Sequence, residues 1–204
     1  MRPKSIRRSL AAAAVAVTSA VALAGAVTPA AQAATACTHQ DDNRPAQNAR
    51  TTVDGRYKPE QWDSKAAVAT ICLINEARTA RGLPELYFFW VSQPLVSNSI
   101  DHGRDLVLHG KVTPTDPHTG SNGSTPAQRM AAYGAGASYW RVNEIVAEPG
   151  NGTPTAAFDW WMNSPGHRAI ILDRELTEMA VHVIGQAPGG GRGATYVVSF
   201  GVRR

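Results

Sequence analysis

The chain has 204 residues, with 20 lysines and arginines against 16 acidic residues and a formal net charge of +4. Four of the basic residues lie among the first eight positions, so the rest of the chain is balanced at 16 against 16. The balanced charge argues against a nucleic-acid-binding protein, because such proteins carry an excess of basic residues. The length is typical of one domain, which buries roughly 70% of its unfolded surface and needs no structural metal.

Residues 1–33 have the three parts of a secretory signal peptide. A basic start precedes an apolar run over residues 10–27, and residues 31–33 read Ala-Gln-Ala, the pattern of a cleavage site. We predict cleavage before Ala34, which removes 33 of the 204 residues and leaves an extracellular protein of 171. No second apolar run approaches 18 residues, so we expect no transmembrane segment after cleavage.

Residues 34–62 are polar and lack helical or strand periodicity, which predicts an irregular N-terminal arm. The two cysteines of the chain are Cys37, in this arm, and Cys72, in the segment that follows. Export into an oxidising compartment favours a disulfide between them, which would tie the arm to the first helix. A reactive thiol is the alternative, and it is disfavoured because the apolar neighbours of Cys72 oppose a thiolate.

Residues 63–204 show helical patterns first and strand patterns last, and the final two strands are joined by a glycine-rich hairpin loop. The predicted helices run from Asp63 or Ser64 to Gly82, from Trp90 to His109, from Thr125 to Gly134 and from Thr153 to Asn163, and the predicted strands cover 141–147, 177–184 and 194–202. This order predicts an α+β domain in which helices cover a small antiparallel sheet.

Three polar residues of this domain are candidates for a functional site. His118 opens a polar loop, His167 follows a helix-breaking Ser-Pro-Gly, and Glu144 lies among apolar residues of a predicted strand. Two imidazoles and a carboxylate can hold a divalent ion such as Zn²⁺ or transfer protons. The sequence has no G-x-S-x-G, P-loop or H-E-x-x-H motif, which argues against the common hydrolase and nucleotide-binding classes.

Five segments carry recognisable motifs in a fixed order. Residues 73–86 are similar to L-x-N-x-x-R…G-L-x-x-L, and His118 keeps the spacing H-x(4)-G-x(5)-R. Residues 143–147 are similar to G-E-N-I-A, residues 161–172 to W-M-x-S-P-G-H-R-x-N-I-L, and residues 196–201 to a closing strand that ends in F-G. In these motifs the chain resembles the bacterial secreted branch of the CAP superfamily, also called the SCP domain.

The resemblance implies an α-β-α sandwich with a three-stranded antiparallel sheet between helices. It also implies a cleft that contains His118, Glu144 and His167. Because the paired histidines bind a divalent metal in some relatives, it suggests His118 and His167 as metal ligands, with Zn²⁺ as the candidate cofactor. A fourth acid of the cleft corresponds to Glu178, for which a structural role in its strand is the alternative.

The chain departs from the family pattern at three places. Ile145 and Ile170 stand where the motifs have asparagine, so two polar contacts around the cleft are missing. Pro114 occupies the family histidine position if the preceding helix is followed without a gap, and His118 comes four residues later. The spacing from His118 to Gly123 and Arg129 favours His118.

The remaining histidines and a tryptophan pair have simpler interpretations. We expect His102 and His109 to be surface or capping residues of their helix, although relatives often have a cleft-facing polar residue at the position of His102. His182 is expected on a sheet face. Trp160 and Trp161 are adjacent, so one is expected in the core and the other beside the cleft, where it can serve as a ligand platform.

Two functions from different classes remain. The first is a secreted binding module whose His/Glu cleft takes a lipid, a cell-envelope component or a protein. The missing asparagines, the balanced charge and the absence of an activated nucleophile favour it. The alternative is a metal- or His/Glu-dependent hydrolase of peptides or cell-wall material, in which His118, Glu144 and His167 are the catalytic candidates.

Overall fold

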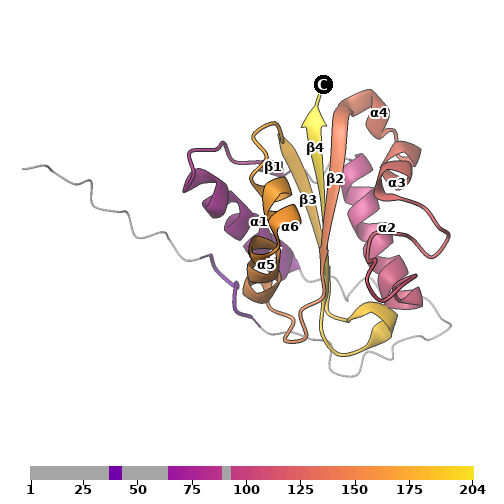
Figure 1. Cartoon of the computed structure of the whole chain (residues 1–204). Coiled ribbons are helices and arrows are strands. Elements are labelled where there is room, and N and C mark those ends of the chain that lie inside the picture. The colour runs from indigo at the N-terminus through magenta and orange to yellow at the C-terminus, as the bar shows by residue number, and fades with distance from the viewer. Residues whose placement is uncertain (1–36, 43–63, 89–92) are drawn as a thin grey trace, which may run out of the picture. The chain divides into compact units, whose positions relative to one another are not determined.

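The computed structural model describes residues 37–42, 64–88 and 93–204 (Figure 1). The predicted signal peptide, most of the predicted arm and the first residues of the second predicted helix lie outside these ranges. The elements in chain order are α1 (Ser64–Thr79), β1 (Tyr87–Phe88), α2 (Gln93–His109), α3 (Pro126–Ala132), α4 (Ala135–Ser138), β2 (Tyr139–Ala147), α5 (Pro154–Asn163), α6 (Pro165–Ile171), β3 (Glu178–Ile184), the 3₁₀ helix η2 (Pro188–Gly190) and β4 (Thr195–Arg203).

Two helices begin where Thr-Pro pairs predicted them. At the start of α3, the Thr125 side chain accepts a hydrogen bond from the Gln128 amide, and the Gln128 side chain accepts one from the Thr125 amide. At the start of α5, the Thr153 hydroxyl accepts from the Ala156 amide at 3.1 Å. These caps pair amides that the first turn of a helix leaves without partners.

The sheet confirms the α+β class and differs from the expectation in strand number. It has four strands in the order β1-β3-β4-β2, with β2, β3 and β4 antiparallel and β1 parallel to β3. The expectation of three antiparallel strands missed β1, because two residues are too short to show an alternating pattern. Asn75 of α1 positions the chain before β1, since its side chain exchanges hydrogen bonds with the backbone of Leu86.

Helices cover both faces of the sheet. In Figure 1, α1, α5 and α6 lie on one side of the strands and α2 and α3 on the other. We call these the α5 side and the α2 side. The sheet is thus buried between two layers, and every residue of β3 is buried.

The α5 side of the sheet holds an apolar core. Alternate residues of the three long strands point into it, among them Ile145 of β2, Val181 of β3 and Phe200 of β4. Trp161 of α5 is fully buried there, and its indole nitrogen donates a hydrogen bond to the Val146 carbonyl at 3.0 Å. Close packing of large side chains gives this face most of the stabilisation from apolar burial.

Arg78 is a buried polar residue at the end of α1. Its guanidinium donates to the carbonyls of Pro84, Ile171 and Asp173 at 2.7–2.9 Å. Burial lowers the pKa of Arg78, and the nearby Asp173 opposes that effect. Arg78 therefore links α1, the loop after it and the end of α6 through carbonyls that would otherwise lack partners.

The disulfide between Cys37 and Cys72 is present, as predicted. It connects the described segment 37–42 to α1. The same segment contacts the first turn of α5, where Thr155 donates its amide to the Gln40 carbonyl at 2.9 Å and its hydroxyl to Asp41 at 2.6 Å. This part of the predicted arm is therefore held at two points.

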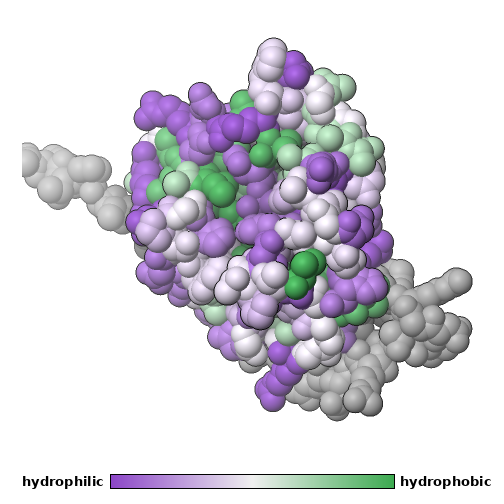
Figure 2. All heavy atoms as spheres, turned by 45° about the vertical axis from the view of Figure 1, so that its right-hand side comes forward, coloured by the Kyte–Doolittle hydropathy of each residue, from purple (hydrophilic) through white to green (hydrophobic). Residues whose placement is uncertain are grey.

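The view in Figure 2 brings the α2 side forward. Hydrophilic residues cover much of this face, and hydrophobic residues gather mainly in its upper half. Of the helices in the described ranges, none combines the length and the hydropathy of a membrane span.

Candidate functional site

Glu144 lies at the centre of a polar cluster on the α2 side. Its side chain is 1% exposed, and its oxygens accept hydrogen bonds from Asn98 at 2.6 Å, from Arg129 Nη2 at 2.9 and 3.1 Å and from His118 Nδ1 at 3.1 Å. Burial opposes ionisation of this carboxyl, but the hydrogen bond from His118, the charge of Arg129 and the hydrogen bond from Asn98 hold the pKa of Glu144 below its usual value.

His118 is held by its own loop as well as by Glu144. Asp116 accepts hydrogen bonds from the amides of His118 and Thr119, and Arg129 donates to the His118 carbonyl at 2.9 Å. An ionised carboxylate only accepts, so the His118 Nδ1 that faces Glu144 carries a proton. Nε2 is then the ring nitrogen left for a ligand, and a third of the side chain is exposed.

His102 belongs to the cluster, and the expectation of a surface or capping residue is wrong. It is fully buried, its Nε2 donates to the Pro117 carbonyl at 2.8 Å, and the same atom lies 3.7 Å from Glu144 Oε1. Burial lowers the pKa of His102, which favours the neutral ring. The sequence feature that could have indicated its burial was its place on one helical stripe with Leu95, Ser99 and Leu106, all of which are buried.

Asn98 is the other cluster residue that sequence reasoning missed. It donates to both Glu144 and Ser199 Oγ, at 2.6 and 2.8 Å, and accepts from Arg129 Nε at 2.9 Å. It therefore connects α2, β2, α3 and β4. Asn98 falls one residue before Ser99 of the predicted stripe, and this adjacency was the sequence feature that could have placed it near the cluster.

His167, at the start of α6, lies opposite His118. The two ring centres are 6.3 Å apart, and the indole of Trp160 lies 4.8 Å from the His167 ring. His167 Nδ1 is buried and has no hydrogen-bond partner. Burial, followed by the charge of His118, lowers the pKa of His167. The structure thus brings His118, Glu144 and His167 together.

Glu178 lies in a different group. It accepts hydrogen bonds from the Tyr139 hydroxyl at 2.6 Å and from Arg203 at 2.7 Å. Because Glu178 pairs with Gly201 and Glu144 with Ser199, strand spacing places the two glutamate Cα atoms roughly 12 Å apart. These contacts fit the structural alternative for Glu178.

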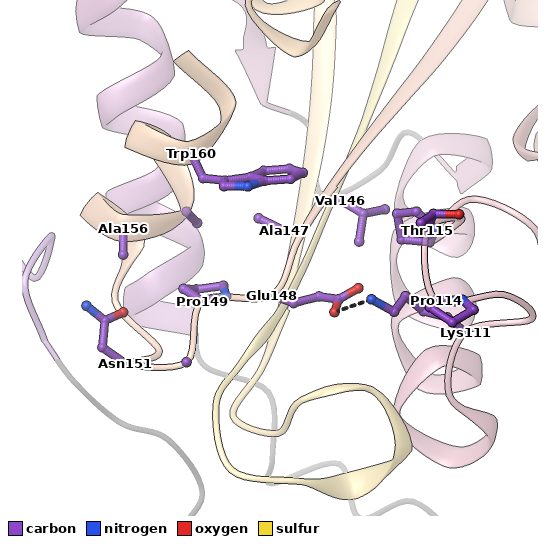
Figure 3. Close-up of a pocket in the computed structure, with 13 residues that line it drawn as sticks. Lys111, Pro114, Thr115, Val146, Ala147, Glu148, Pro149, Asn151, Ala156 and Trp160 are labelled. Carbon is purple, nitrogen blue, oxygen red and sulfur yellow. Dashed lines mark hydrogen bonds and ion pairs between the residues drawn. The ribbon is translucent and has the colours of Figure 1, made fainter. Parts of the chain in front are cut away.

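A pocket opens beside Trp160, whose indole contacts His167 (Figure 3). It has a volume of about 630 Å³, within the range of small-molecule sites. Trp160 of α5 extends across it from one side, and the ion pair between Lys111 and Glu148 lies at the opposite side. Pro117, whose carbonyl accepts from His102, also lines it, so the pocket and the cluster adjoin. Pro114 also lines the pocket, at the position where the ungapped family pattern places histidine.

The two adjacent tryptophans lie in different environments, as expected. Trp161 is in the core, and Trp160 is 51% exposed beside the site.

The histidine pair is too widely spaced to hold a tetrahedral Zn²⁺ as the rings lie. A Zn²⁺ bound to an imidazole nitrogen lies roughly 3.2 Å from the ring centre, so an ion shared by two rings 6.3 Å apart would lie nearly in line between them, whereas Zn²⁺ prefers tetrahedral ligands. Glu144 is also poorly suited, because its oxygens already accept from several donors. In the described ranges, the one group of three ligand atoms within 4.8 Å of one another is Cys37, Cys72 and Glu76, whose sulfurs are bonded together.

A sequence comparison identifies a family. The model of the cysteine-rich secretory protein family, CAP, matches residues 71–200. No curated protein compared with the chain matches it.

Solved structures share the fold. An outer surface protein from Borrelia burgdorferi is 22% identical with a TM-score of 0.53, over 66% of this chain and 90% of that one. An extracellular protein containing a SCP domain from Bacillus anthracis is 21% identical with a TM-score of 0.53, over 73% and 45%. A cysteine-rich secretory protein from Staphylococcus aureus is 15% identical with a TM-score of 0.50, over 72% and 41%. The chain thus spans less than half the length of the last two.

Proposed function

This chain belongs to the CAP family of cysteine-rich secretory proteins, and from that premise we propose that it is a secreted binding module. Its cleft, formed by His118, His167 and the adjoining pocket, takes a lipid, a cell-envelope component or a partner protein. The N-terminal signal pattern and the disulfide support export into an oxidising space. N-terminal sequencing of protein from the culture medium is expected to begin at Ala34, and an intact leader there contradicts the predicted cleavage.

The bonding of Glu144 carries the proposal for binding over catalysis. Its two oxygens accept from Asn98, Arg129 and His118. A carboxylate with this many donors, and with a lowered pKa, is a weak proton acceptor. Glu144 therefore fixes the orientation of His118 rather than accepting a proton itself.

Co-sedimentation tests the proposal. The purified protein is mixed separately with vesicles of envelope lipids, with cell-wall sacculi and with solubilised envelope proteins immobilised on beads. Retention on one fraction without release of soluble fragments is expected, and His167→Ala is expected to weaken it. His109→Ala is the matched control, because His109 is exposed on α2. No retention on any fraction contradicts the binding module.

A hydrolase is the second candidate, favoured by the convergence of His118, Glu144 and His167 in one cleft. In that case the two histidines would hold a divalent ion, which would supply a bound water of lowered pKa, and Glu144 would orient His118. Elemental analysis of protein purified without chelators is expected to find stoichiometric metal that a His118→Ala/His167→Ala double variant loses. Fragments released from sacculi by the wild type and not by this variant would replace the binding proposal with the hydrolase.

A further inference from the structure

The pocket beside Trp160 has one aromatic wall. Trp160 is half exposed although its neighbour Trp161 is fully buried, and its indole reaches over the pocket from α5 (Figure 3). A flat, exposed indole can stack against the apolar face of a ligand ring. His167 packs against the same indole, with 4.8 Å between ring centres, and so supports its orientation.

The opposite wall carries a donor and an acceptor side by side. Lys111 Nζ and Glu148 Oε2 are 3.0 Å apart, and their side chains are 27% and 23% exposed. The ammonium has three protons and the carboxylate has four acceptor sites, so both groups keep bonding capacity after they pair. This wall can therefore bind groups that donate and accept at once.

Most of the remaining lining is apolar. Pro114, Pro117, Pro149 and Ala147 contribute to it, and prolines offer no amide proton, whereas Thr115 and Asn151 add two polar side chains. The pocket thus pairs an apolar platform with polar groups around its edge.

This combination discriminates between ligand classes. An alkyl chain in the pocket would remove water from the Lys111–Glu148 pair without replacing its hydrogen bonds, which is costly. A ligand with a single charge can pair with one of these two groups only by displacing the other and by approaching its like charge. A neutral polyol meets neither penalty, because each hydroxyl both donates and accepts.

We infer that this pocket binds a pyranose ring of a cell-envelope glycan, with its C–H face on Trp160 and its hydroxyls at Lys111 and Glu148. The inference rests on the proposed function and narrows its ligand to a carbohydrate. The volume of about 630 Å³ suits a ligand of more than one sugar ring. Because Trp160 touches His167, an adjoining ring reaches the histidine pair.

Calorimetric titration of the purified protein tests the inference with two probes, the tetrasaccharides of β-1,4-linked N-acetylglucosamine and of mannose. At least one is expected to bind, and Trp160→Ala is expected to weaken it by about tenfold or more through loss of the stacking surface. Glu148→Gln is expected to weaken it as well. Trp140→Ala is the matched control: Trp140 is 69% exposed on β2 beneath Arg204, so affinity should stay within about twofold.

Thermal unfolding of each variant shows whether it remains folded. Binding of neither tetrasaccharide, or equal binding by Trp160→Ala and the wild type, overturns the glycan inference. Palmitate binding that depends on Trp160 overturns it too and assigns the pocket to lipid. In all these cases retention on an envelope fraction still supports the binding module, whereas loss of that retention removes both proposals.

Discussion

Toward α1, α5 and α6 the sheet presents apolar side chains, whereas toward α2 and α3 it presents a mixture. The strands alternate, so Ile145 and Glu144 are neighbours in sequence and point to opposite faces. On the α2 side the apolar clusters are smaller, and Glu144, His182 and Ser199 are buried between them. One face therefore supplies stability by packing, and the other buries polar groups that must be paired to be tolerated.

The largest expected loss of stability comes from a substitution on the α5 side. Trp161→Ala removes a fully buried indole and its hydrogen bond to Val146, so the free energy of unfolding should fall by about 4 kcal/mol. Trp160→Ala is the adjacent control, and as a half-exposed residue it should cost well under about 2 kcal/mol. Urea unfolding measures both, and equal losses would contradict the division between the two tryptophans.

The next largest loss of stability is expected from substitutions on the α2 side. Glu144→Gln leaves the Arg129 guanidinium, 11% exposed, without its carboxylate partner, and should lower the free energy of unfolding by about 3 kcal/mol. Arg129→Met should cost a similar amount, while the double variant should cost less than the sum of the two. Additive losses in urea unfolding would show that the pair is not coupled.

The two sides should also respond differently to pH. Burial lowers the pKa of His182 to about 3, whereas an unfolded histidine keeps its ordinary value. As the pH falls below about 6.5, the unfolded chain therefore binds a proton at this residue that the folded chain does not bind. The free energy of unfolding then falls by about 1.4 kcal/mol per pH unit for this residue.

Unfolding measured from pH 7 to pH 4 checks this dependence. His182→Gln should reduce the slope by one proton, whereas Val183→Ala, on the α5 side, should lower stability at every pH with the slope unchanged. His102 and His167 have lowered pKa values too, so some slope should remain. A wild-type slope in His182→Gln would contradict the assignment.

The smallest effect should be the same on both sides. Thr125 caps α3 on the α2 side and Thr153 caps α5 on the other. Each Thr→Ala variant should lower the free energy of unfolding by about 1 kcal/mol, because a cap acts within one helical turn whatever its helix packs against. Thermal unfolding would contradict this if only one of the two variants were destabilised.

Local patterns in the sequence predicted most of the fold. Segments rich in β-branched residues predicted the last two strands, and the Thr-Pro caps predicted the starts of α3 and α5. The break at Ser164-Pro165-Gly166 was expected, but α6 was not, because proline and glycine signal an end as readily as a new start. In the structure Ser164 closes α5 and opens α6, with Pro165 at the first helical position.

The site was predictable only in its motif residues. The spacing argument chose His118 over Pro114, and the structure places His118 against Glu144 and Pro114 in the pocket. Asn98 and His102 join Glu144 from α2, 46 and 42 positions away in the chain. Contacts at such separations depend on how elements pack, which periodicity within one element does not report.

The double attachment of segment 37–42 has a consequence for proteolysis. A protease that cuts the chain once between Asp42 and Ser64 leaves Cys37 joined to Cys72, so the product runs as one covalent species on a non-reducing gel. Two bands appear only after reduction. The hydrogen bonds from Thr155 to Gln40 and Asp41 each contribute only about 1 kcal/mol, so the severed peptide then dissociates from α5.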